Sequence, residues 1–117
     1  ELEAGRKLAE KFLIAREKKP YTAIVAINDL IAYGIMQRLQ EQGVRIPEDV
    51  SVISFDNIPY SSRVQPPLTT MHMPARLLAQ RACRLITDSL NSSEDHSRIT
   101  LSVSAELVVR KSVACIG

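Results

Sequence analysis

Two short segments of the chain are apolar on nearly every residue, and both stop at polar side chains. Residues 22–27 lead into Asn28 and Asp29, and residues 50–55 lead into Asp56 and Asn57. A strand with this pattern is typically covered on both faces, as in parallel sheets. The pattern therefore predicts two buried strands whose carboxyl ends carry acids and amides.

Three other segments repeat their apolar positions at helical spacing. They are residues 2–18, which Pro20 ends, residues 29–42 ahead of Gly43, and residues 74–90, where Pro74 suits the first turn. The middle helix joins the two buried strands. A strand–helix–strand unit of this length is parallel with a right-handed crossover, so the pattern predicts an α/β fold with a parallel sheet.

The remaining elements are shorter or differ in period. Residues 57–67 form a proline-marked loop before a short strand at 68–72, and residues 91–97 form a polar loop. From Ile99 to Val109 every odd position is apolar. This alternation predicts a long strand, or two collinear strands, with a single buried face at a sheet edge.

Length and composition narrow the class of protein. With 117 residues, 45% of them hydrophobic, there is room for one ordinary globular domain. A formal net charge of +2 does not suggest a nucleic-acid or membrane surface, and the longest uncharged stretch, residues 20–28, is too short to span a bilayer. Cys83 and Cys115 are predicted to be reduced thiols. Because the chain begins inside a helical pattern without methionine, we expect a piece of a longer protein.

Acids at the ends of consecutive parallel strands can hold Mg²⁺ for phosphoryl transfer, which raises this chemistry for Asp29 and Asp56. Such sites usually add a cation for the phosphoryl oxygens, but no lysine lies between Lys19 and Lys111. His72 and His96 have no metal-binding spacing. The sequence thus predicts no enzyme, no metal site and no cofactor, and Asp29 is interpreted as a first-turn acid favoured by the helix dipole.

A binding crevice is the alternative for these strand ends, since ligands of open α/β sheets bind beside the carboxyl ends of the strands. The Asn28 amide offers donors and an acceptor, and the Asp56 carboxylate accepts from paired hydroxyl groups. That pair suits a sugar or a nucleoside-like ligand. Spacing alone leaves a second interpretation open, in which Asn28 caps its helix and Asp56 caps the following loop.

Several of these motifs, in this order and spacing, resemble the C-terminal part of the effector-binding domain of LacI/GalR-family transcriptional regulators. The most specific are Pro-Glu-Asp-Val-Ser-Val at 47–52 and Pro-Pro-Leu-Thr-Thr at 66–70. They are accompanied by Asn28-Asp29, Phe55-Asp56 and the segment 106–110. The resemblance covers nearly all of the chain.

The resemblance implies a fragment of a type I periplasmic-binding-protein-like fold, in which two Rossmann-like subdomains with parallel sheets hold ligand between them. Residues 1–71 would belong mostly to the C-terminal subdomain, and residues 74–100 to the N-terminal subdomain. Residues 104–117 would form a return strand and tail. In this family a helix-turn-helix upstream of the effector-binding domain binds DNA.

The resemblance also implies roles for individual residues. Asn28 and Asp56 correspond to positions that hydrogen-bond effector hydroxyl groups, and His72 lies near positions that sometimes reach the ligand. A dimer interface of the C-terminal subdomain is implied for Tyr33, Met36, Ile58, Tyr60 and Val64. Core packing is the other interpretation of Tyr33 and Met36.

Three positions depart from the family pattern. Ser54 stands where glycine is common, and Asn57 where aspartate is frequent. Ala75 stands where one member of the family has a bulky aromatic residue. The last difference implies a ligand pocket unlike that member's, so the same sugar is not assumed.

Taken together, these features predict the effector-sensing fragment of a bacterial, cytoplasmic LacI/GalR-type regulator that is not an enzyme. Its expected partners are a sugar or related polar effector, a second copy in a homodimer, and operator DNA bound through the upstream helix-turn-helix. An exported substrate-binding protein of a sugar transporter shares the fold and is the competing prediction. The segment 66–70 and the apolar loop at 58–60 favour the regulator.

Overall fold

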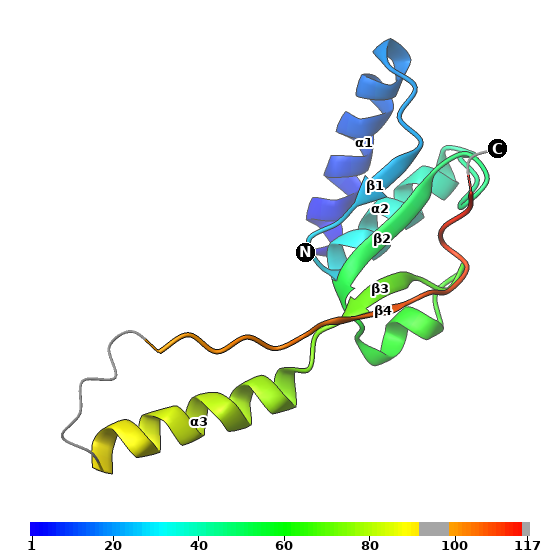
Figure 1. Ribbon diagram of the computed structural model, residues 1–117. Helices are drawn as coiled ribbons and strands as arrows, with labels where there is room; N and C mark the ends of the chain where they lie inside the picture. The colour runs from blue at the N-terminus through cyan, green and yellow to red at the C-terminus, as the bar shows by residue number, and fades with distance from the viewer. Residues whose placement is uncertain (92–98, 116–117) are drawn as a thin grey trace. The chain divides into compact units, whose positions relative to one another are not determined.

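The computed structural model describes residues 1–91 and 99–115, and most of the polar loop expected at 91–97 lies outside them. The chain divides into two compact units (Figure 1). The larger unit combines Glu1–His72 with the C-terminal segment that begins at Leu107, and the smaller unit is Met73–Glu106.

The sheet has the strand order β1-β2-β3-β4, formed by β1 (Ala23–Val25), β2 (Ser51–Asp56), β3 (Thr69–His72) and β4 (Glu106–Val108). β1 pairs parallel with β2, and β2 pairs parallel with β3. Helix α2 (Asp29–Glu41) connects β1 to β2. The predicted parallel strand–helix–strand unit is therefore confirmed, with strands somewhat shorter than the apolar runs.

β1 differs from the expectation of a buried strand. It lies at one end of the strand order, and Val25 and Ile27 are 69% and 75% exposed. The apolar run was a correct signal for a strand. It was wrong about burial, because only one face of this segment is covered. Ile24 and Ala26 pack on the core, whereas Val25 and Ile27 point to the opposite face, which the described residues leave exposed.

Helix α1 (Leu2–Lys18) packs on α2, and α2 packs on β2 (Figure 1). Two glycines allow the helices to approach closely. A Cβ atom at Gly5 would overlap the backbone oxygen of Ile31, and one at Gly34 would overlap the backbone oxygen of Leu2. Backbone contact replaces side-chain interdigitation at this crossing.

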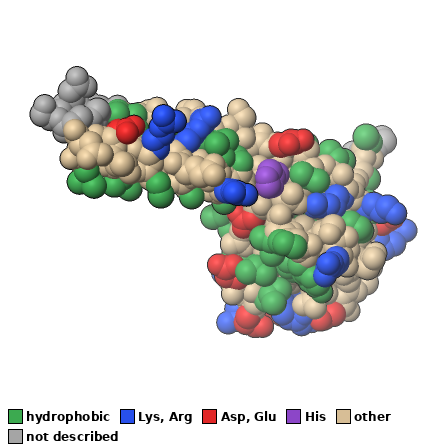
Figure 2. All heavy atoms as spheres, turned by 90° about the horizontal axis from the view of Figure 1, so that it is seen from below, with side chains coloured by type: hydrophobic (Ala, Val, Ile, Leu, Met, Phe, Trp, Pro, Cys, Tyr) green, Lys and Arg blue, Asp and Glu red, His purple; other side chains and the backbone are tan. Residues whose placement is uncertain are grey.

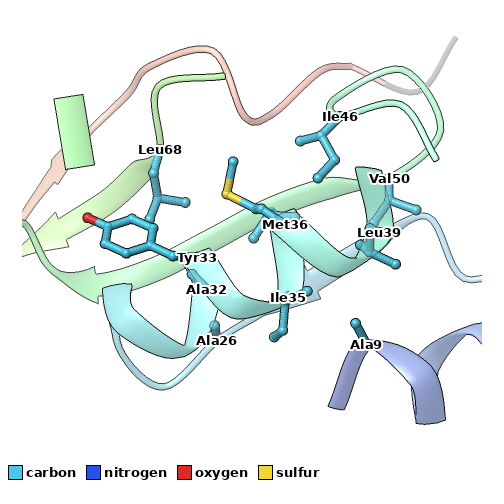
Figure 3. Close-up of a cluster of buried hydrophobic side chains, with 11 residues drawn as sticks. Ala9, Ala26, Ala32, Tyr33, Ile35, Met36, Leu39, Ile46, Val50 and Leu68 are labelled. Atoms are coloured by element: carbon cyan, nitrogen blue, oxygen red, sulfur yellow. The ribbon is translucent and has the colours of Figure 1, made fainter. Parts of the chain in front are cut away.

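The core of the larger unit gathers side chains from α2 and the segments around it (Figure 3). Leu39, Val50, Val52 and Leu68 are fully buried. The remaining core residues are Ala9, Ala26, Ala32, Tyr33, Ile35, Met36 and Ile46. Burial of this apolar surface, at about 25 cal/mol per Å² removed from water, is the main force holding α2 against the sheet.

The C-terminal segment ties β2 to β3 through polar groups. The Ser112 hydroxyl is buried, donates to the Val52 carbonyl at 2.6 Å and accepts from the Thr69 N–H at 2.8 Å. The Val52 N–H donates to the Ser112 carbonyl at 2.8 Å. Because these backbone groups are buried, each bond satisfies a group that would otherwise cost free energy to bury.

The smaller unit contains α3 (Ala75–Asn91), which buries none of its residues. Figure 2 shows hydrophobic side chains gathered along one flank of this helix and basic side chains along another. The strand predicted over residues 99–109 is wrong for 99–105, where the structure has no strand; only β4 forms. Alternation alone does not make a strand, since the backbone also needs a paired neighbour, and α3 is the only regular element described alongside residues 99–105.

Among the residues that the structure describes, no helix is both long and apolar enough to cross a membrane.

Candidate functional site

The carboxyl ends of β1, β2 and β3 lie at the same edge of the sheet because the three strands are parallel. Asn28 follows β1, Asp56 ends β2 and His72 ends β3. Asp56 and His72 are partners in the strand register. The structure thus brings two of the predicted ligand residues side by side and places the third after the neighbouring strand.

Asn28 caps α2, as one of the two interpretations of the sequence expected. Its Oδ1 accepts from the Ile31 N–H at 2.9 Å, and its backbone is extended. This bond satisfies one of the free N–H groups in the first turn. The side-chain Nδ2 donates to Glu1 at 3.4 Å, so the donor half of the amide faces an exposed partner.

Asp56 is exposed, and its backbone has a φ of 113°. Positive φ is uncommon outside glycine and recurs at binding sites, where the surrounding structure holds it in place. Burial of part of the carboxyl group, followed by the negative charges of Asp29 and Glu1, raises the pKa of Asp56 above its usual value. The surroundings of Asp56 disfavour its ionised form. Hydrogen bonds donated by ligand hydroxyl groups would therefore stabilise that form.

Asn57 continues this unusual backbone with a φ of 57° and joins the strand ends to the C-terminal segment. Its Oδ1 accepts from Arg110 Nη2 at 2.7 Å, and its Nδ2 lies 3.3 Å from His72 Nδ1. Arg110 also donates to the Leu68 carbonyl at 2.7 Å. Asn57 and Arg110 therefore hold the loop beside Asp56, a role for Arg110 that sequence patterns did not reveal.

Asp29 is fully buried beneath these strand ends. Its Oδ1 accepts from the hydroxyls of Ser54 and of Thr70, the latter at 2.7 Å. Its Oδ2 accepts from the Ser61 hydroxyl and, at 3.0 Å, from the Ile58 N–H. The interpretation of Asp29 as a simple first-turn acid was incomplete, because all four donors come from positions 25 to 41 residues away.

The four donors also bear on the magnesium alternative. Both carboxylate oxygens of Asp29 are occupied by protein donors, so neither is free for a metal ion. Within residues 1–91 and 99–115, no group of three or more His, Cys, Asp or Glu residues has the arrangement of a metal site. The geometry at the strand ends suits hydrogen bonding to a ligand.

A groove of about 400 Å³ lies on another face of the larger unit, between α2 and η1 (Pro59–Ser62). Four of the five predicted interface residues line this groove: Tyr33, Met36, Tyr60 and Val64. The fifth, Ile58, packs against the hydrophobic core. Tyr60 is 57% exposed and meets Tyr33 edge to face at a centroid distance of 5.4 Å. Tyr33 and Met36 are 5% and 2% exposed, so both also serve as core residues.

Residues 2–113 match the family model of a periplasmic binding protein-like domain. The chain is 42% identical over 106 residues to the HTH-type transcriptional repressor PurR of Vibrio cholerae, an alignment that covers 91% of this chain. It covers 31% of that relative. The chain thus spans about a third of the length of the curated relatives it matches.

Two solved structures agree with this match. A ribose-bound LacI family regulator from Enterococcus faecalis superposes with a TM-score of 0.87 at 32% identity, over 100% of this chain and 42% of that one. A LacI family regulator from Arthrobacter sp. in complex with lactose gives a TM-score of 0.78 at 36% identity, over 97% and 42%. Sequence and fold therefore point to the same group of proteins.

Proposed function

Since this chain belongs to the periplasmic binding protein-like domain family, as found in LacI/GalR-type regulators, we propose that it forms part of an effector-binding cleft in such a regulator. The parallel sheet with its strand ends on one edge is one wall of that cleft. The intact protein binds operator DNA through a helix-turn-helix upstream of this region and works in the bacterial cytoplasm. The relatives described above are regulators and not enzymes, so no reaction is assigned.

The proposed ligand site consists of Asn28, Asp56 and His72. The observation that carries it is the exposed carboxylate of Asp56, held by an unusual backbone beside His72 at the carboxyl ends of β2 and β3. Donor groups from Asn28 and His72 and the acceptor oxygens of Asp56 suit the hydroxyl groups of a sugar. Ribose and lactose occupy two of the regulators that this chain resembles, which supports the same ligand class here.

We also propose that residues 74–100 belong to the opposite subdomain in the intact protein. The division of the chain into two compact units, of which the smaller is Met73–Glu106, and the lack of buried residues in α3 support this proposal. Effector then binds between two walls and favours the closed arrangement over the open one. The ligand shifts this two-state equilibrium only by its difference in affinity for the two states, and the shift reaches the DNA-binding heads.

The groove between α2 and η1 is proposed as the homodimer contact, with Tyr60 and Val64 as its accessible apolar residues and Tyr33, Met36 and Ile58 supporting them from below. Sedimentation equilibrium of the intact protein should give twice the chain mass. Val64→Asp should shift that mass toward the monomer, because a charge at an apolar contact loses its water without gaining a partner. A monomeric wild type, or an unchanged dimer in the variant, would contradict this assignment.

The ligand site is tested by Asp56→Ala in the intact protein. Ribose, lactose and cellobiose are first screened by thermal shift, and the sugar that stabilises the wild type is then titrated by calorimetry. Asp56→Ala should weaken its binding by about 2–4 kcal/mol, because charge-assisted bonds are lost and ligand hydroxyls are left without partners.

Two further variants separate the charge from its surroundings. Asp56→Asn keeps the side-chain shape and tolerates positive φ better than alanine, so it reports on the carboxylate alone. Glu17→Ala removes a carboxylate from an exposed position on α1 and should leave binding unchanged. Equal affinity in the wild type and both Asp56 variants would show that the site is misassigned.

A further inference from the structure

The buried carboxylate of Asp29 is surrounded by four uncharged donors, the hydroxyls of Ser54, Ser61 and Thr70 and the Ile58 N–H. Ser54, Ser61 and Thr70 are themselves fully buried. Burying an ionised carboxylate is costly unless hydrogen bonds replace its water. Asn28 already caps α2, and none of the four donors belongs to that helix, so this set of donors calls for a further explanation.

The donors form two directed chains that converge on Asp29. A serine hydroxyl has a single proton, and Ser61 gives its proton to Asp29 Oδ2. The 2.8 Å bond between Tyr33 and Ser61 must therefore run from the tyrosine hydroxyl to Ser61 Oγ. This first chain connects Asp29 to Tyr33, which lines the groove beside η1.

The second chain runs to the loop that carries the proposed ligand site. Thr70 donates its proton to Asp29 Oδ1 at 2.7 Å and accepts from the Asn57 N–H at 3.3 Å. Ile58 donates its N–H to Asp29 directly at 3.0 Å. Asp29 thus anchors the backbone immediately after Asp56, where φ is positive at both Asp56 and Asn57.

We propose that Asp29 is a positioning residue that holds two functional surfaces at once, the ligand loop Asp56 to Ile58 and the groove wall formed by η1 and Tyr33. The inference rests on the proposed function for what those surfaces bind, but the positioning itself is a property of the chain. Ser54, which stands where the family commonly has glycine, adds a donor from β2 and fixes the carboxylate against the sheet. Each surface is held by its own chain of hydrogen bonds, and both chains end at the same carboxylate.

Hydrogen exchange of backbone amides in the intact protein tests this without any ligand. Asp29→Asn keeps the side-chain size but places an NH₂ donor where two protein donors converge. Exchange at Asn57 and Ile58, at Ser61 in η1 and at Arg63, which caps the end of η1, should be faster by about tenfold or more. The control is Val52→Ala, a core variant outside the network, compared at equal distance below its own melting temperature.

Two milder variants separate the chains. Thr70→Val removes the hydroxyl between Asn57 and Asp29 and should accelerate exchange in the ligand loop alone. Tyr33→Phe removes the donor to Ser61 and should accelerate exchange in η1 alone. If Asp29→Asn does not fold, this pair decides the matter.

The proposal is overturned if Asp29→Asn changes these amides no more than Val52→Ala does. It is also overturned if Thr70→Val and Tyr33→Phe each affect both segments equally, because the two chains would then not be separate. Since no sugar is used, this result is independent of the Asp56 titration. A failed titration with the expected exchange pattern would remove the ligand assignment and leave the role of Asp29 standing.

Discussion

Helices α2 and α3 have similar signatures in the sequence and very different surroundings in the structure. Both repeat apolar residues at helical spacing. α2 buries seven residues between α1 and the sheet, among them Tyr33, Met36 and Leu39, whereas α3 buries none. Leu90, near the end of α3, is 81% exposed.

The difference shows what an apolar stripe can and cannot indicate. The spacing of apolar residues identifies which face of a helix has to be buried, because residues on one face recur about every 3.6 positions. It does not identify what supplies the cover. For α2 the cover comes from α1 and β2 within the same unit, whereas the described residues of the smaller unit bury no side chain of α3.

The largest effect is expected from a pair of side-chain substitutions that compare the two helices, Leu39→Ala in α2 and Ile86→Ala in α3. Leu39 is fully buried and Ile86 is 61% exposed. Leu39→Ala should lower the free energy of unfolding of the chain by about 2–5 kcal/mol, because it removes apolar contacts and leaves a cavity. Ile86→Ala should change it by less than about 0.5 kcal/mol. Urea unfolding measures both.

The same pair in the intact protein sharpens the comparison. If the opposite subdomain covers α3 there, Ile86→Ala should become costly while the cost of Leu39→Ala stays the same. Equal costs for the two variants in the 117-residue chain would mean that the contrast between the helices is wrong.

A smaller effect is expected from Gly34→Ala, which tests how α2 receives its cover. The added methyl group would overlap the Leu2 backbone, so α1 must shift away from α2. Overpacking of this kind costs about 1–3 kcal/mol in unfolding free energy. The melting temperature of the chain should fall accordingly.

Gly43→Ala is the matched control for Gly34→Ala. Gly43 has open space around it but a φ of 77°, so its cost of about 1 kcal/mol should come from the backbone alone. Gly43→Asn should recover part of that loss, because asparagine tolerates positive φ. Asparagine at Gly34 should give no recovery, and recovery there would contradict a packing role for Gly34.

Much of the fold of the larger unit could be predicted from local patterns. Helix boundaries at 2–18 and 29–42 agree with α1 and α2 to within a residue, since capping residues and Pro20 mark their ends. The parallel order of β1 and β2 followed from the length of the helix between them. The strand expected at 99–105 was wrong because a strand depends on a partner that alternation does not reveal.

The candidate site divides in the same way. Residue types and their places at strand ends were enough to raise Asn28 and Asp56 as ligand contacts beside a capping role, and the family resemblance added His72. The role of all three as ligand contacts stays a prediction. The network around Asp29 was not visible, because Ser54, Ser61 and Thr70 are ordinary polar residues at no regular spacing from it. The residues around a serine or threonine do not indicate which acceptor its hydroxyl group will bond to.

The sequence by itself determined α1, α2 and the parallel relation of β1 to β2, because helical periodicity, helix ends and the length of a crossover can all be read along the chain. Only the tertiary structure decided which face of β1 stays open, that α3 buries none of its residues, and that one buried carboxylate bonds to both the ligand loop and the groove wall. Burial and hydrogen-bond partners are set by segments far apart in sequence. Burial and hydrogen-bond partners are therefore set only when folding brings those distant segments together.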